Sequence, residues 1–179
     1  MFFLEVFDQT IKKLKSQTAN LFTLANLSLG GFAILFGIQG NLRLSLLLIF
    51  LAALADRFDG MVARKFNIES ELGKQLDSMS DIISFGIAPA LLLYHGILYE
   101  FGGPGMFFTI FYIGCGAFRL ARFNITESNG YFTGLPITVA GCLATLSFLG
   151  IPYFPAQSFL FIMIVLSFLM VSTFKLKKV

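Results

Sequence analysis

The chain alternates long apolar stretches with short polar connections, and six of these stretches approach the length of a membrane-spanning helix. A helix needs about 20 predominantly apolar residues to cross the hydrocarbon core of a bilayer. The six stretches cover residues 20–38, 43–65, 73–98, 105–123, 135–152 and 156–174. The pattern predicts an all-α integral membrane protein, with six transmembrane helices in one domain over residues 1–179 and the helix bundle over residues 20–174.

Residues 1–17 have a different, amphipathic pattern. Apolar residues recur there at helical spacing with three lysines between them, namely Phe3, Phe7, Ile11 and Leu14 with Lys12, Lys13 and Lys15. An apolar face opposite a basic one is typical of a helix that lies in the membrane interface. The sequence therefore predicts a short interfacial helix over residues 1–17, and a frayed cytoplasmic tail is the alternative.

Composition agrees with a membrane protein. Hydrophobic residues make up 56% of the chain and charged residues 13%, with a mean hydropathy of +0.81, which excludes an ordinary soluble domain. The two cysteines are too few for a disulfide framework, and His95 has no second histidine with which to form a metal site.

The basic residues alternate between the two sides of the predicted membrane. One side has only Arg43, and the other has Lys12, Lys13, Lys15, Arg64, Lys65, Lys74, Arg119, Arg122, Lys175, Lys177 and Lys178. Because cytoplasmic loops carry an excess of lysine and arginine, both termini are predicted to be cytoplasmic. The protein is then a multi-pass protein of the cell membrane.

Four aspartates, Asp56, Asp59, Asp77 and Asp81, lie at the cytoplasmic ends of the second and third segments. Each ionised carboxylate costs about 2.5 to 3.5 kcal/mol at bilayer depth, so a compensating partner is expected. Spacings of three and four place each pair on one helix face, and two helices joined by a short loop pack antiparallel. The four carboxylates are therefore predicted to converge on one or two divalent cations, and the site is predicted to face the cytoplasm.

Two adjacent cations are well suited to hold a diphosphate during an in-line displacement. A divalent-cation transporter is the alternative from another class. An ion pathway needs polar residues through the full membrane depth, whereas here they lie at one side.

Small and basic residues surround the aspartates. Gly60, Ala63 and Gly73 leave room for a ligand against the backbone, and Arg64 can reach a phosphate. The alternatives are close helix packing by the small residues and an arginine that extends to lipid head groups.

Together these residues form the pattern D-x-x-D-G-x-x-A-R, an eight-residue spacer, and G-x-x-x-D-x-x-x-D. The pattern resembles the signature of the CDP-alcohol phosphotransferases, without a departure. The resemblance implies a six-helix, homodimeric membrane enzyme in which an alcohol hydroxyl displaces CMP from a CDP-linked substrate.

The same resemblance implies a role for each matching residue. Asp56, Asp59, Asp77 and Asp81 would bind Mg²⁺ or Mn²⁺, in two ions, and Asp81 would also act as the catalytic general base. Gly60, Ala63, Arg64 and Gly73 would bind the nucleotide and its diphosphate. A looser match upstream adds Asn20, Thr23 and Asn26 to the nucleotide pocket.

Three further blocks, residues 77–89, 119–124 and 133–136, resemble the membrane-type phosphatidylserine synthases of Gram-positive bacteria and archaea. The implied substrates are CDP-diacylglycerol and L-serine. Another acceptor, glycerol phosphate or inositol phosphate, is the alternative within the family.

The residues themselves allow a serine acceptor. Arg119 and Arg122 share a helix face at the level of the aspartates, where a guanidinium could bind the serine carboxylate. They could equally bind a lipid phosphate or a phosphorylated acceptor. Ser84 and Asn124 are further candidates for acceptor contacts, although serines in membrane helices often bond their own backbone. Pro89 is predicted to kink the third segment.

Overall fold

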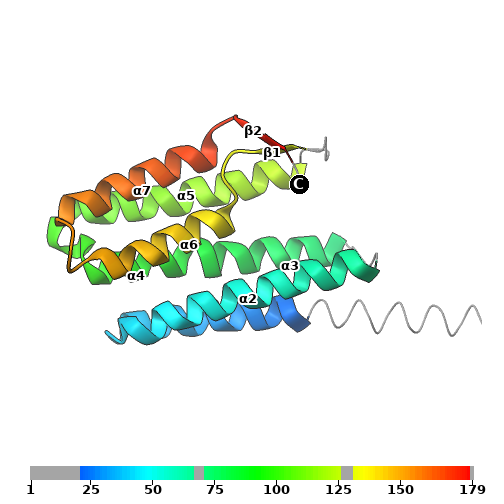
Figure 1. Ribbon diagram of the computed structural model, residues 1–179, viewed down its shortest axis with the longest axis horizontal. Coiled ribbons are helices and arrows are strands. Elements are labelled where there is room, and N and C mark those ends of the chain that lie inside the picture. Colours follow the sequence, from blue (N-terminus) through cyan, green and yellow to red (C-terminus); the bar gives the residue numbers. More distant parts are fainter. Residues whose placement is uncertain (1–20, 67–70, 126–130, 178–179) are drawn as a thin grey trace, which may run out of the picture.

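The structure is a computed structural model that describes residues 21–66, 71–125 and 131–177. The predicted interfacial helix at 1–17 and Asn20 lie outside the described residues. Within them, the chain forms a bundle of antiparallel helices (Figure 1). Their bounds are Leu21–Ile38, α2 Leu42–Phe66, α3 Glu71–Asp81, η1 Ile82–Ile87, α4 Ala88–Gly96, η2 Leu98–Phe101, α5 Gly103–Ile125, α6 Ile137–Ser147, η3 Phe148–Gly150 and α7 Ala156–Val171.

The all-α membrane fold class is confirmed. The helices Leu21–Ile38, Glu71–Gly96 and Gly103–Ile125 are long and apolar enough to cross a membrane, and Ile137–Gly150 and Ala156–Val171 are apolar but shorter. At 25 residues α2 also has the length, but the charges of its C-terminal half lower its hydropathy. The helices coincide with the six predicted segments, and the number that cross the bilayer stays a prediction.

Apolar side chains lie on the outside of the bundle as well as inside. Phe85, Tyr112 and Met163 are fully buried in the core, whereas Ile110 on α5 and Phe161 on α7 are more than 60% exposed. Large apolar side chains facing outward from several helices are expected where lipid, not water, covers the surface.

The third segment is not a continuous α-helix. Its central part, η1, is a π-helix in which the Ala88 N–H donates to the carbonyl of Ile83, five residues back. Pro89 follows directly and has no N–H of its own to donate. The hydroxyl of Tyr112 on α5 donates to the carbonyl of Phe85 at 3.1 Å, which satisfies a backbone acceptor inside the core. The third segment thus contains a π-helical turn directly after Asp81, and the kink predicted at Pro89 stays a prediction.

Two short strands join the loop before α6 to the end of the chain, a feature that the sequence analysis did not predict. β1 Tyr131–Thr133 pairs antiparallel with β2 Lys175–Lys177, with Thr133 opposite Lys175. Figure 1 shows them at the end of the bundle where α5 and α7 also terminate. The strand pair therefore connects the α5–α6 loop to the segment after α7.

Close packing around η1 depends on glycine at one position of α6. A Cβ atom at Gly141 would lie 2.6 Å from the Phe85 carbonyl oxygen and 2.8 Å from Phe85 Cα, both of them backbone atoms that cannot rotate away. Gly114 on α5 has no atom within 4 Å of the corresponding position. Small residues let membrane helices approach this closely.

We expect Gly141→Ala to destabilise the protein by about 1 to 3 kcal/mol, because the added methyl group forces α6 away from η1. Gly114→Ala is the matched control and should leave stability unchanged or raise it by up to about 1 kcal/mol. Thermal unfolding in detergent measures both. Equal melting temperatures for the two variants would contradict the close contact.

Candidate active site

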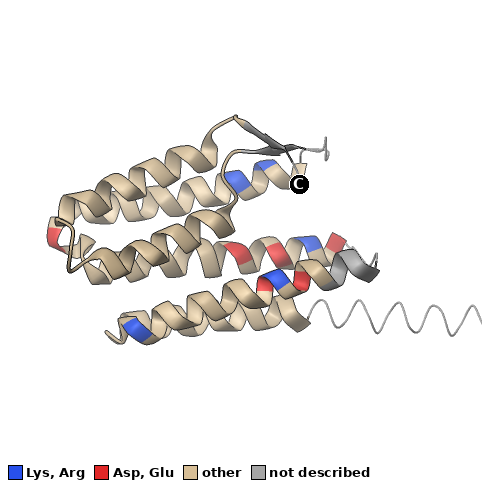
Figure 2. Cartoon of the chain, in the orientation of Figure 1, with Lys and Arg blue, Asp and Glu red and all other residues tan. Residues whose placement is uncertain are grey.

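The charged residues gather at one end of the bundle. Figure 2 shows acidic and basic residues on α2, α3 and α5 at the end where α2 gives way to α3. Arg43 at the start of α2 and Glu100 in η2 lie at the opposite end, and Figure 2 shows no lysine, arginine, aspartate or glutamate in the described part of the bundle between the two ends. The candidate site therefore lies at one end of the helices, as the sequence pattern predicts.

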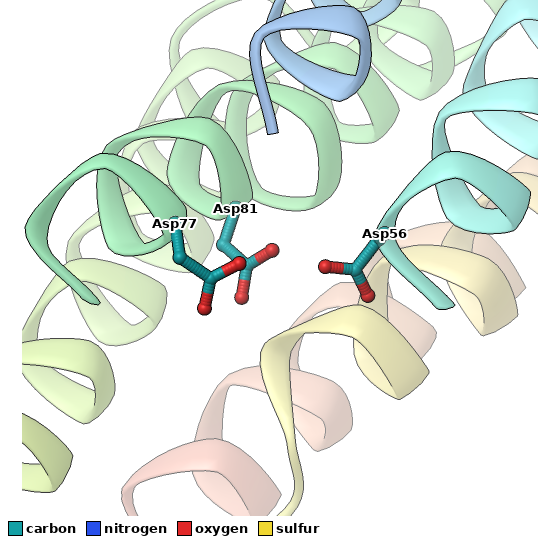
Figure 3. A group of neighbouring side chains, drawn as sticks. All are labelled: Asp56, Asp77 and Asp81. Carbon is teal, nitrogen blue, oxygen red and sulfur yellow. The ribbon is translucent and has the colours of Figure 1, made fainter. Parts of the chain in front are cut away.

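Three of the four aspartates meet between α2 and α3. Figure 3 shows Asp77 and Asp81 on one helix with their carboxylates directed toward Asp56 on the neighbouring helix. One carboxylate oxygen from each of the three lies within 4.8 Å of the other two. We call Asp56, Asp77 and Asp81 the carboxylate cluster. It forms because the two antiparallel helices each present an aspartate face to the other.

Asp59 is not part of this cluster. It is buried on α2, and its Oδ2 accepts a hydrogen bond from the Thr23 hydroxyl on the helix Leu21–Ile38. Thr23 was predicted to line the nucleotide pocket, and here its hydroxyl binds an aspartate. A metal role for Asp59 stays a prediction.

The carboxylate cluster fits a divalent cation. Its oxygens are hard donors of the kind that Mg²⁺ and Mn²⁺ prefer. Oδ1 of Asp81 is buried and has no hydrogen-bond partner among the described residues. A buried, unpartnered carboxylate oxygen is costly unless something else compensates its charge. A metal ion held by the cluster would supply that compensation.

Two hydrogen bonds join the helix Leu21–Ile38 to the segment that carries Asp77 and Asp81. Ser80 Oγ donates to the Thr23 carbonyl at 3.1 Å, and Ser84 Oγ donates to the Asn26 carbonyl at 3.0 Å. Gly30 permits this approach, since a Cβ there would lie 2.9 Å from Ser84 Cα. The hydroxyl of Ser84, which the sequence predicts to contact the acceptor, therefore donates to a backbone carbonyl. Asn26 is fully buried, and neither polar atom of its side chain has a hydrogen-bond partner among the described residues.

A cavity of about 650 Å³ opens beside the cluster, between α2, α3 and α6. Its charged lining residues are Asp56, Arg57 and Asp77, and Gly60 lies next to them without a side chain. The rest of the lining is mainly apolar and comprises Phe50, Ala53, Leu54, Thr138 and Cys142. A cavity with an acidic side and an apolar side suits a ligand that has both a charged head and a lipid portion.

Six of the nine lining residues are not among the predicted site residues, and three of these six, Arg57, Thr138 and Cys142, carry a charged, hydroxyl or thiol group. Arg57 had a signal in the sequence, because a charge inside an apolar segment indicates function. Thr138 and Cys142 had none, because only the packing of α6 brings them to the cavity. Of the predicted nucleotide residues, Gly60 lines the cavity and Gly73 lies one turn before Asp77. The side chains of Ala63 and Arg64 lie outside the described part of the structure.

The two arginines of α5 have different partners. Arg119 is buried, and its charge interacts with that of Asp81. Its guanidinium also lies 5.1 Å from the centre of the Phe123 ring. Arg122 donates to backbone carbonyls at the end of α7. Asn124, a predicted acceptor contact, donates to Ser78 Oγ at 2.9 Å.

Comparison with known proteins gives consistent matches. The family described as CDP-alcohol phosphatidyltransferase matches residues 16–176. A CDP-diacylglycerol–serine O-phosphatidyltransferase of Bacillus subtilis is 41% identical over 130 residues, which cover 72% of this chain and 73% of that protein. An archaetidylserine synthase of Methanothermobacter thermautotrophicus is 40% identical over 174 residues, which cover 94% and 73%. A CDP-diacylglycerol–serine O-phosphatidyltransferase of Helicobacter pylori is 38% identical over 130 residues, which cover 71% and 55%.

A metal ion bound by the carboxylate cluster should stabilise the fold. We expect millimolar Mg²⁺ or Mn²⁺ to raise the melting temperature of the protein in detergent, because a ligand that binds only the folded state stabilises it. Asp77→Asn removes one donor and should abolish most of this rise. Glu71→Gln is the matched control, since Glu71 lies on the same helix but its side chain is 86% exposed. An unchanged metal response in Asp77→Asn would exclude this residue as a ligand.

Proposed function

Because the chain belongs to the CDP-alcohol phosphatidyltransferase family and is therefore a transferase, we propose that it acts as a phosphatidylserine synthase. In this reaction the hydroxyl of L-serine attacks CDP-diacylglycerol and releases CMP. The observation that carries the proposal is the carboxylate cluster beside a cavity with both charged and apolar lining. The names of the similar proteins support serine as the acceptor. Neither the family match nor the one-sided charges favour a cation transporter.

The proposed cofactor is a pair of bound divalent ions, either Mg²⁺ or Mn²⁺. Asp56, Asp77 and Asp81 would hold it, with Asp59 as the fourth predicted ligand. When bound, such ions neutralise the diphosphate oxygens and the charge of the leaving CMP. Gly60 borders the cavity and leaves space for the diphosphate, and Arg57 offers it a guanidinium. Ala63, Arg64, Gly73, Asn20, Thr23 and Asn26 stay predicted contacts of the nucleotide.

Asp81 is proposed as the general base. The serine oxygen forms a bond to the phosphorus that carries the diacylglycerol, and the bond from this phosphorus to the oxygen shared with CMP breaks. The hydroxyl proton passes to the carboxylate of Asp81, which is buried beside Asp56 and Asp77. A hydroxyl is a poor nucleophile until its proton is removed, so a positioned base is needed.

Arg119 is proposed to bind the serine carboxylate. It is buried, its charge acts on Asp81, and its Nε has no hydrogen-bond partner among the described residues. A guanidinium matches the two oxygens of a carboxylate. The carboxylate would therefore be held close to the base that activates the hydroxyl of the same molecule.

The remaining proposals concern the protein in the cell. The one-sided charges support a site at the cytoplasmic surface, with both termini cytoplasmic. A single domain and a homodimer stay predictions from the sequence. An ester-linked and an ether-linked lipid would present the same nucleotide head group, and the similar proteins include an archaetidylserine synthase.

We expect purified protein with Mg²⁺ or Mn²⁺ to release CMP from CDP-diacylglycerol only when L-serine is present. The assay compares L-serine with sn-glycerol 3-phosphate, inositol and inositol phosphate at equal concentrations. CMP release that another acceptor drives equally well would overturn the serine assignment and leave the family unchanged.

Asp81→Asn should lower turnover by about 10²-fold to 10⁴-fold, because it removes the proton acceptor. Binding of the CDP-lipid should be largely retained, as measured by ligand-induced thermal stabilisation. Glu100→Gln changes an acidic residue at the opposite end of the bundle and should leave both quantities unchanged. Near-normal turnover in Asp81→Asn would show that another group takes the proton.

A further inference from the structure

Arg119 and Arg122 lie three positions apart at the end of α5, yet they act on different parts of the protein. Arg119 is 6% exposed, and among the described residues it is the cation whose charge acts on Asp81. Arg57 lines the cavity from α2, next to Asp56 in the chain, and Lys74 pairs with Glu71 at the surface. Of these three cations in the described structure, Arg119 is therefore the one that we expect to bind the acceptor next to Asp81.

The guanidinium of Arg122 binds the C-terminal end of α7. Nη1 donates to the Val171 carbonyl at 2.8 Å, and Nη2 donates to the carbonyls of Ser172 at 3.1 Å and Met170 at 3.4 Å. The last carbonyls of a helix lack partners within the helix and carry partial negative charge. A guanidinium is a favourable partner for them, so these bonds hold Arg122 at α7.

Gly134 packs against the same carbonyls and against the guanidinium of Arg122. Its φ is +74°, and a Cβ there would lie 2.6 Å from the Met170 oxygen, 2.8 Å from the Ser172 oxygen and 3.2 Å from Arg122 Nη2. The Gly134 N–H also donates to the Phe174 carbonyl at 3.0 Å. We call Arg122, Gly134 and the carbonyls of residues 170–172 the α7 junction. Only glycine lets the backbone come this close to the guanidinium without strain.

We propose that Arg122 is a positioning residue that sets acceptor specificity: the α7 junction holds its guanidinium away from the active site, so that of these two arginines Arg119 meets the acceptor anion. The proposal rests on the proposed function. It separates two arginines that sequence spacing alone would assign to one ligand.

The charges of the possible acceptors explain how the position of Arg122 affects specificity. Serine carries one carboxylate with a single negative charge, which one guanidinium can satisfy through two parallel hydrogen bonds. A phosphomonoester acceptor such as glycerol 3-phosphate carries up to two charges on three oxygens. One buried guanidinium beside an acidic cluster leaves part of that charge uncompensated, and a buried uncompensated charge is costly. Holding Arg122 at α7 therefore favours serine over a phosphorylated acceptor.

The first test separates the roles of the two arginines. It compares kcat/KM for L-serine with that for serinol, which keeps the amine and hydroxyl groups but has no carboxylate. Arg119→Gln should reduce the preference for serine over serinol by about tenfold or more, because a charged hydrogen bond is lost. Arg122→Gln should keep the preference within about twofold while lowering the melting temperature. Equal loss of the preference in both variants would overturn the proposal, because Arg122 would then bind the carboxylate directly.

The second test releases Arg122 without removing it. Gly134→Ala introduces a methyl group into the α7 junction, and Gly114→Ala on α5 is the matched control. We expect the ratio of CMP release with sn-glycerol 3-phosphate to that with L-serine to rise by about tenfold in Gly134→Ala. The double variant Gly134→Ala/Arg122→Gln should lose this gain, since the released charge is what binds the phosphate.

A folded Gly134→Ala variant with an unchanged ratio would overturn the proposal. If this variant does not fold, the serine preference of Arg122→Gln decides the matter alone: retention supports the proposal and loss overturns it. The wild-type protein is assayed first with serine and the other acceptors. A wild type that shows no serine-dependent CMP release refutes the proposed function itself, so the two failures are distinguishable.

Discussion

Carboxylates of like charge repel one another strongly where little water screens them, and Asp56, Asp77 and Asp81 have oxygens within 4.8 Å of one another inside an otherwise apolar bundle. Such a group needs a counter-charge to stay ionised, and the positive charge of Arg119 acts on Asp81. The remaining charge is what a divalent cation would neutralise. α2 and α3 present these aspartates to one another at the end of the bundle where most of the charged residues lie.

Hydrogen bonds from side-chain hydroxyl groups to backbone carbonyls hold the helices around the cluster together. Ser80 and Ser84 bind carbonyls of the helix Leu21–Ile38, and Tyr112 binds the Phe85 carbonyl in the π-helical turn. In lipid there is no water to satisfy such carbonyls, so each hydrogen bond made inside the protein helps fix the position of a helix. The π-helical turn begins directly after Asp81. The backbone irregularity thus adjoins the residue proposed as the general base.

The sequence predicted the helical fold and the approach of three of the four aspartates for a definite reason. Hydropathy and helical spacing are local properties, and they sufficed to locate the helices and to place Asp77 and Asp81 on the face that meets Asp56. The spacing did not separate Asp59 from the other three, because its partner Thr23 is 36 positions away in the chain. Nor did it indicate that Arg119 and Arg122, three residues apart on one helix, have different partners.

The sequence by itself therefore determined the membrane class, the helices, the family signature and the acidic chemistry, because all of these are written in residue type and short-range spacing. Only the tertiary structure decided which side chains meet: that Thr138 and Cys142 of α6 line the cavity, that the strand β1 pairs with β2, and that Arg122 binds the end of α7. Contacts between helices depend on how closely backbones approach, and that distance is set by residues such as Gly134 and Gly141 together with their partners, not by either sequence segment alone.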